Sequence, residues 1–263
     1  TGRQSQSPRA SRGLMKFQPL KGAHTVDSSQ RLDQCFLKKG EIVTLLERER
    51  NAVVKYGRRL VERGLTRGTG GNVSVLSRER RLFAVSPSGM DYFETRPEDV
   101  VVLDMEGNVA DGARRPSSEV EMHRLLYLER EDVGAVVHTH SVYATAVSCT
   151  REAQAGGLPP VHCAAALAGG DVRCTAYYPF GTRELAEAAC EGMRGRFAVL
   201  LGNHGVLAAG SDVGHAFALA EQLEFACEVL VHAASVGTPA LLSSSDLLAA
   251  RERFRDYGQG RRE

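Results

Sequence analysis

The chain has 263 residues, enough for one large domain or two small ones, and its 43% hydrophobic and 25% charged residues are ordinary for a globular protein. The formal net charge of +1 and the lack of a basic stripe exclude an electrostatic footprint for nucleic acid. No apolar run approaches the roughly 20 residues that a membrane-spanning helix needs, so we expect no membrane partner.

Residues 1–30 are rich in Ser, Arg, Gln and Gly and have little hydrophobic periodicity. We expect them to be a disordered extension without a secretory signal, followed by one domain over residues 31–263. The cysteines are scattered, with no Cys-x-x-Cys pair and no disulfide framework, which is typical of a reducing compartment and predicts a cytoplasmic protein. They are Cys35, Cys149, Cys163, Cys174, Cys190 and Cys227.

The first half of the chain alternates between helix and strand patterns. Apolar residues recur at helical spacing from Lys39 to Arg63, and Gly64 then supplies a stop, so we predict one long amphipathic helix. Ser118 is expected to cap a second helix that runs to about Glu129. Short apolar runs bounded by turn residues predict three strands between these helices, at Asn72–Leu76, Arg81–Val85 and Val100–Leu103.

The second half continues the alternation. Its apolar runs predict strands at Gly134–Val137, Phe197–Leu201 and Val206–Ala209. Helices are predicted at Val142–Ser148, at Arg183–Met193 with Thr182 as N-cap, and at Val213–Ser235 with Ser211 or Asp212 as N-cap. Because helices interleave with strands throughout, we predict a single α/β domain.

Two histidines at the end of a predicted strand, His138 and His140, are the most informative residues of the chain. Strand side chains alternate between faces, so both imidazoles point the same way, with Cα atoms roughly 6.5 Å apart, and can converge on one divalent cation. His204 follows another apolar run, and Glu119 supplies a carboxylate. Three imidazoles and one acid predict a zinc-type site at Glu119, His138, His140 and His204.

Two other histidines compete for such a role. Glu119 and His123 are four residues apart and share one face of a predicted helix, which makes His123 an alternative ligand. His162 is a weaker alternative, and a histidine with a purely structural role is common enough to stay open for each of them.

Three segments rich in glycine and hydroxyl groups predict a phosphate-binding site. Gly68–Ser74 is neither a Walker loop nor a dinucleotide fingerprint, but its glycines let backbone amides approach an anion, and Thr69 and Asn72 add donors. Ser86–Gly89 and Pro116–Glu119 have a similar character at element ends. Each segment alone is also compatible with a simple turn or helix cap, whereas three together favour a phosphorylated ligand.

With these motifs in order, the chain resembles the class II aldolase/adducin family over residues 40–258. The resemblance rests on Gly-Thr-x-Gly-Asn-Val-Ser-Val at 68–75, Ser88-Gly89, Pro-Ser-Ser-Glu at 116–119 and Val-Val-His-Thr-His at 136–140. It continues through Phe-Gly-Thr-Arg-Glu-Leu at 180–185, the His204-Gly205 turn and a terminal Phe254-x-x-Tyr257-Gly258. Several separated motifs in the same order are far more specific than any one of them.

The resemblance implies a three-layer α/β/α domain around a largely antiparallel sheet, assembled as a homotetramer with active sites between subunits. It implies one zinc ion per subunit on His138, His140 and His204, with Glu119 as the acid that coordinates or leaves the metal and moves a proton. It also assigns phosphate binding to Gly71, Asn72, Ser88, Gly89, Ser117 and Ser118, beside Thr69.

The implied activity is reversible cleavage of a ketose 1-phosphate of the L-fuculose type, through an enediolate, to dihydroxyacetone phosphate and a small aldehyde. One departure matters, because Cys163 stands where the family has a tyrosine that protonates the aldehyde oxygen. Tyr177, Tyr178 or Tyr257 is a candidate replacement.

Because of this departure, an aldolase for 5-deoxyribulose or methylthioribulose 1-phosphate stays an alternative. Ribulose-5-phosphate 4-epimerases and methylthioribulose-1-phosphate dehydratases on the same fold are further alternatives, and a non-enzymatic adducin-like module is disfavoured by the complete ligand set.

Overall fold

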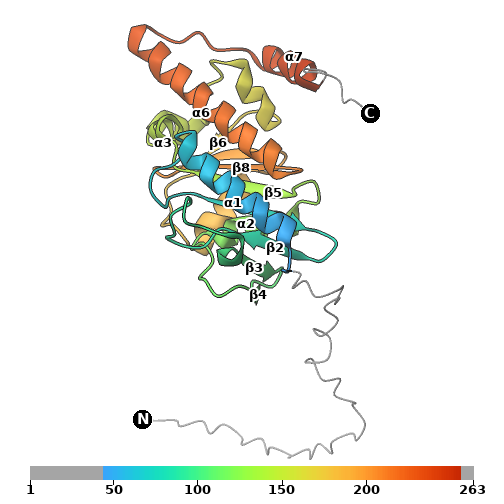
Figure 1. Cartoon of the computed structure of the whole chain (residues 1–263). Coiled ribbons are helices and arrows are strands. Elements are labelled where there is room, and N and C mark those ends of the chain that lie inside the picture. The colour runs from blue at the N-terminus through green and yellow to red at the C-terminus, as the bar shows by residue number, and fades with distance from the viewer. Residues whose placement is uncertain (1–43, 256–263) are drawn as a thin grey trace, which may run out of the picture. The chain divides into compact units, whose positions relative to one another are not determined.

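One sheet of eight strands organises residues 44–255, the part of the chain that the computed structural model describes (Figure 1). All of these residues belong to one structural unit, which begins at Thr44. The expectations for residues 1–30, for the predicted helix from Lys39 to residue 43 and for Tyr257 lie outside the described residues.

The sheet has the strand order β4-β3-β2-β1-β5-β8-β7-β6 and is antiparallel except for the pair β6–β7. Neighbours in this order include strands far apart in sequence, such as β1 with β5 and β5 with β8. The strands are β1 (Asn72–Ser77), β2 (Leu82–Val85), β3 (Val101–Asp104), β4 (Val109–Asp111), β5 (Ala135–Thr139), β6 (Arg173–Cys174), β7 (Ala198–Leu201) and β8 (Gly205–Gly210).

Helices cover both faces of the sheet. Figure 1 shows α1 and α6 lying across the same side of it, and α3 packs on α6, whereas α2 and α5 pack together on the other side. The α-helices are α1 (Glu47–Glu62), α2 (Val120–Glu129), α3 (Val142–Ser148), α4 (Arg151–Gly156), α5 (Arg183–Gly192), α6 (Val213–Val236) and α7 (Ser244–Arg255), and the 3-10 helices are η2 (Pro97–Asp99) and η3 (Cys163–Ala168).

Alternation along β5 explains how one strand serves two cores. Ala135 and Val137 are fully buried in the core under α6, whereas Val136 is buried in the core under α2 and α5. His138 follows Val136 by two residues, so its side chain joins the α2 side. The predicted three-layer α/β/α domain with a largely antiparallel sheet is confirmed.

Several element boundaries differ from the predictions. Helix α1 begins at Glu47, because Leu46 has a left-handed backbone with φ of 54° and cannot continue a helix. At its other end Gly64 has φ of +69°, as expected of a glycine stop. The predicted strands and the other predicted helices are present with ends shifted by at most one or two residues.

Two cap predictions have different outcomes. Ser118 is not the cap of α2: Glu119 occupies that position, and Ser117 Oγ accepts the hydrogen bond from the Glu119 amide. Asp212 caps α6 by accepting from the His215 amide, which decides between the two predicted candidates.

The patterns missed β4, β6, α4 and α7. The first two are strands of three and two residues, too short for an alternation to be visible. Within the described range, no helix combines the length and the apolar character needed to cross a bilayer.

Candidate metal centre

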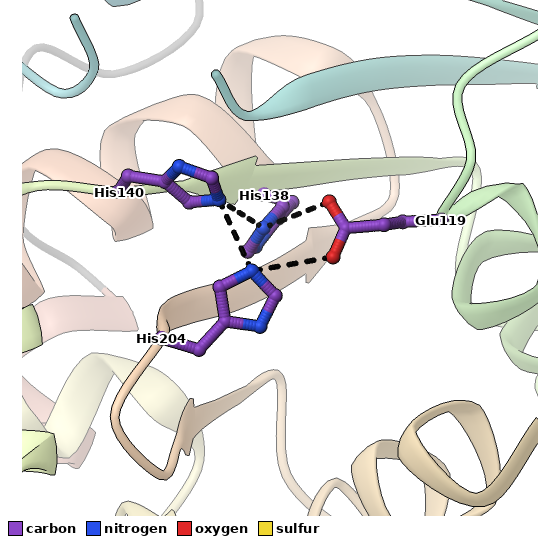
Figure 2. Close-up of side chains that lie close together, drawn as sticks. All are labelled: Glu119, His138, His140 and His204. Atoms are coloured by element: carbon purple, nitrogen blue, oxygen red, sulfur yellow. Dashed lines mark hydrogen bonds and ion pairs between the residues drawn. The ribbon is translucent and has the colours of Figure 1, made fainter. Parts of the chain in front are cut away.

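Three imidazoles and one carboxylate meet at the end of β5 that faces α2, as Figure 2 shows. His138 lies in β5 and His140 just after it, His204 lies in the turn between β7 and β8, and Glu119 immediately precedes α2. One potential ligand atom from each of the four lies within 4.8 Å of all the others. The predicted cluster is therefore assembled from three separate parts of the chain.

The separations between these atoms suit a shared cation. His138 Nε2 and His204 Nε2 lie 2.9 Å and 3.1 Å from His140 Nε2. Glu119 Oε2 lies 3.3 Å from His138 Nε2, and Glu119 Oε1 lies 3.2 Å from His204 Nε2. Ligands bonded at about 2.0–2.1 Å in tetrahedral geometry stand about 3.3–3.4 Å apart, which is close to this spacing.

The backbone explains how His204 reaches the cluster. Leu201 and Gly205 pair across β7 and β8, which leaves a tight three-residue turn between them. Asn203 takes the left-handed conformation in this turn, with φ of 55°, which asparagine tolerates better than most residues. Its side-chain oxygen accepts a hydrogen bond of 2.8 Å from Gln154, which ties the turn to α4.

Hydrogen bonding fixes the tautomer of His138. Its Nδ1 lies 3.0 Å from the carbonyl oxygen of Val206, and because a carbonyl only accepts, Nδ1 carries the proton of the neutral ring. The Nε2 lone pair is then directed at the cluster. A backbone carbonyl that accepts from the other ring nitrogen is a usual way in which proteins orient a metal-binding histidine.

The charges in the cluster favour an ionised Glu119 beside neutral His140 and His204. Burial raises the pKa of Glu119, but the neighbouring His138 and His204 outweigh burial and bring this pKa to about 2. Burial, together with the nearby His138, lowers the pKa of His140 and of His204 to about 4, although Glu119 partly offsets this effect. Glu119 outweighs burial at His138 and raises that pKa.

A buried oxygen also indicates that the residues fit a cation. Oε1 of Glu119 has no hydrogen-bond partner, although the residue is only 6% exposed, whereas Oε2 accepts from Asn72 Nδ2 at 3.1 Å. An unpaired, buried, ionised oxygen is costly unless a positive charge stands near it. Three imidazole nitrogens and one carboxylate form a donor set that zinc and related divalent ions prefer.

The cluster opens into a cavity of about 460 Å³. Glu119, His140 and His204 line this cavity, while His138 is fully buried behind them. All seven residues that the sequence nominated for phosphate binding also line it, namely Thr69, Gly71, Asn72, Ser88, Gly89, Ser117 and Ser118. The structure thus places the predicted anion loops and the histidine cluster in one space.

The two competing histidines lie elsewhere. His123 is fully buried and bonds to Asn72 and Ser74, so it does not join the cluster. His162 stands before η3, where its Nδ1 accepts from the Ala164 amide. Cys163 begins η3 and is not among the described residues that line the cavity.

Tyr177 and Tyr178 line the cavity, together with two residues that the sequence analysis did not nominate, Phe180 and Asn203. Phe180 lies in the Phe-Gly-Thr-Arg motif that carried part of the resemblance, and its place in this motif was a signal that it could line the site. Asn203 had a weaker signal, as the residue next to a candidate ligand.

Comparison with known proteins agrees with this geometry. The family described as the Class II Aldolase and Adducin N-terminal domain matches residues 51–231. The chain belongs to this family. It is similar to a 5-deoxy-D-ribulose 1-phosphate aldolase of Bacillus thuringiensis serovar kurstaki, with 46% identity over 82% of the chain and 99% of that relative.

Other relatives point the same way. A 5-methylthioribulose-1-phosphate/5-deoxyribulose-1-phosphate aldolase of Rhodospirillum rubrum is 37% identical over 80% of the chain and 92% of its own length. A solved structure of an L-fuculose 1-phosphate aldolase is 42% identical, with a TM-score of 0.75 over 79% of the chain and 96% of that structure. The chain is a metal-dependent class II aldolase, a carbon–carbon lyase.

Proposed function

We propose that this class II aldolase cleaves 5-deoxyribulose 1-phosphate, or its methylthio analogue, reversibly to dihydroxyacetone phosphate and a small aldehyde. Breaking the C3–C4 bond of the first sugar yields acetaldehyde, and the second yields methylthioacetaldehyde. The observation that carries the proposal is the cluster of Glu119, His138, His140 and His204 at one cavity with three neutral, hydroxyl-rich loops. The relatives favour this substrate over the L-fuculose 1-phosphate that we expected first.

We assign the metal to zinc, one ion per subunit, held by His138, His140 and His204 with Glu119 beside them. When bound, the ion would stabilise the negative charge that develops on substrate oxygens as the carbon–carbon bond breaks. Charge stabilisation of this kind is commonly worth on the order of 3–4 kcal/mol per well-placed group. The histidines themselves hold their Nε2 lone pairs toward one point and take no proton from the substrate.

Glu119 is proposed to move the proton at substrate C3. Its low pKa keeps the carboxylate ionised at neutral pH, so it can accept this proton from dihydroxyacetone phosphate in the direction of synthesis. In the direction of cleavage it returns the proton to the same carbon. Oε1 lacks a protein hydrogen bond, whereas Oε2 is held by Asn72. Oε1, which Asn72 does not hold and which lies 3.2 Å from His204 Nε2, is the oxygen proposed to transfer the proton.

The three loops are proposed to bind the phosphate. Ser117 and Ser118 lie just before α2, where helix amides carry partial positive charge, and Ser88 and Gly89 form a second wall of the cavity. None of the described residues that line the cavity is Lys or Arg. Neutral donors would therefore fix the phosphate and place the reacting carbons near the cluster.

The aldehyde half of the substrate is proposed to lie against aromatic side chains. Tyr177 and Phe180 are 59% and 70% exposed, and both line the cavity with Tyr178. Rings of this kind favour an apolar tail, such as a methyl or methylthio group, over the hydroxylated tail of an L-fuculose derivative. Tyr177 and Tyr178 stay candidates for protonating the aldehyde oxygen in place of Cys163.

A coupled assay tests the proposal. The zinc-loaded protein is mixed with 5-deoxyribulose 1-phosphate, and the released dihydroxyacetone phosphate is reduced by an NADH-dependent dehydrogenase while absorbance is followed. We expect steady NADH oxidation, faster than with L-fuculose 1-phosphate. An epimerase or a dehydratase would consume its sugar phosphate without releasing dihydroxyacetone phosphate. An adducin-like module would not consume the sugar phosphate at all.

The homotetramer that the resemblance implies is also part of the proposal. Light scattering coupled to gel filtration would measure the mass of the assembly directly, and a monomeric, fully active enzyme would contradict shared active sites.

A further inference from the structure

A buried chain of side-chain hydrogen bonds runs from the candidate acid into the protein core. Asn72 Nδ2 lies 3.1 Å from Glu119 Oε2, and Asn72 Oδ1 lies 2.5 Å from His123 Nε2. His123 Nδ1 lies 2.7 Å from Ser74 Oγ, which in turn lies 2.6 Å from Tyr127 Oη. All five residues are buried, with no more than 6% of any of them exposed. The mechanism proposed above does not use the last three.

The chain follows from the local structure of β1 and α2. Asn72 and Ser74 are two residues apart on β1, so their side chains share the face that α2 covers. His123 and Tyr127 are four residues apart on α2, so they share one helix face. Asn72 is also the strand partner of His138, which places the chain next to the metal-binding cluster.

Only one direction of donation satisfies every atom. The ionised Glu119 carboxylate only accepts, so Asn72 must turn its amino group to it and its oxygen to His123. That oxygen accepts a proton from His123 Nε2, which leaves Nδ1 as an acceptor for the Ser74 hydroxyl. Ser74 Oγ then accepts from Tyr127. The charge of Glu119 thus dictates the Nε2–H tautomer of His123.

Burial keeps His123 uncharged. Burial and the neighbouring His138 together lower the pKa of His123 to about 3, and Glu119 only partly offsets them. The imidazole is therefore a fixed dipole with one donor and one acceptor, and it does not carry protons. Its two neighbours, Asn72 and Ser74, take up both ring nitrogens.

We propose that His123 is a positioning residue, which locks the Asn72 amide so that one carboxylate oxygen of Glu119 is anchored and the other stays free to react. This inference rests on the proposed role of Glu119 in proton transfer. Without the His123 donor, the Asn72 amide can flip or rotate, and Glu119 Oε2 loses the hydrogen bond that it accepts from Asn72. The carboxylate would then sample orientations that do not face the substrate carbon.

Two substitutions of His123 distinguish a role in positioning Asn72 from a role in core packing alone. His123→Leu removes both hydrogen bonds, whereas His123→Gln keeps a terminal amide that can still donate to Asn72. We expect His123→Leu to lower kcat about 10- to 100-fold with wild-type zinc content, and His123→Gln to recover most of this loss. Leu126→Ala, a core change on the same helix, is the matched control: it should lower the melting temperature and leave kcat unchanged.

Proton exchange measures separately the step that is assigned to Glu119, the transfer of the proton on the substrate carbon. Dihydroxyacetone phosphate alone is incubated with enzyme in deuterium oxide, and loss of its carbon-bound proton is followed by NMR. Exchange should fall in parallel with kcat for His123→Leu. Full kcat in His123→Leu, equal losses in the Leu and Gln variants, or zinc loss that accounts for the loss of activity would each overturn the proposal.

A spectroscopic readout decides the proposal even if the enzyme acts on other substrates. Long-range nitrogen–proton NMR of the labelled wild-type protein reports the tautomer of His123 directly. We expect the Nε2–H form, unchanged between pH 5.5 and pH 8, because this imidazole stays neutral at those pH values. An Nδ1–H tautomer would refute the proposed chain of hydrogen bonds. A wild-type enzyme that neither exchanges the proton of dihydroxyacetone phosphate nor releases this product from a sugar phosphate would contradict the proposed function instead.

Discussion

Gly70 lies against a candidate metal ligand, and this close approach makes a sharp prediction. A methyl group added at Gly70 would stand 2.8 Å from His140 Nδ1 and 3.0 Å from Thr66 Oγ1. Nonbonded heavy atoms pack at about 3.5–4.0 Å, so the imidazole of His140 would have to retreat by roughly 0.5 Å or more. Metal sites tolerate errors of only about 0.2 Å in their bond lengths.

Gly70→Ala should therefore weaken zinc binding about 10- to 100-fold, which is the usual cost of disturbing the surroundings of a ligand. Overpacking should also destabilise the fold by about 1–3 kcal/mol. The affinity is measured by competition with a chromophoric chelator, and the stability by thermal unfolding of the metal-free protein.

Gly68→Ala is the matched control on the same loop. Its methyl group would meet nothing within 4 Å, although its φ of +59° makes the backbone strained with any side chain. This variant should lose about 1 kcal/mol of stability and keep its zinc affinity. The reasoning is refuted if Gly70→Ala binds zinc as tightly as the wild type, or if both variants lose affinity equally.

Three further predictions concern single side chains. Glu119→Gln should keep its zinc and its affinity for phosphate but lose about 10²- to 10⁴-fold in kcat, because an amide of the same shape cannot accept the proton; full activity in the coupled assay would remove Glu119 from the mechanism. His140→Ala should lower the zinc content of purified protein measured by atomic emission, and an unchanged stoichiometry would contradict its role as a ligand. Arg50 is 1% exposed, donates to the carbonyl oxygens of Leu45, Pro97 and Val100, and pairs with Asp111. Arg50→Met should lower the free energy of unfolding in urea by about 3 kcal/mol with little change in KM. A decrease of less than about 1 kcal/mol would show that these carbonyls find other partners.

The elements with long periodic patterns were predictable from the sequence. Helix α5 with its Thr182 cap, helix α6 and strands β5, β7 and β8 follow from apolar spacing and capping residues within the chain itself. The short strand β4 and helix α7 were not, because a three-residue edge strand has no readable period and α7 presents mostly exposed residues. Such elements form because of the neighbours on which they pack.

The sequence by itself determined which residue types stand at His138 and His140, that both face the same side of one strand, and that hydroxyl and glycine loops follow at other element ends. Only the tertiary structure decided that His204 completes the cluster and that His123 does not. Local periodicity fixes the direction of a side chain relative to its own strand or helix. The distance between two elements depends on strand order, and here the order β1-β5-β8 brings together residues 66 positions apart, His138 and His204.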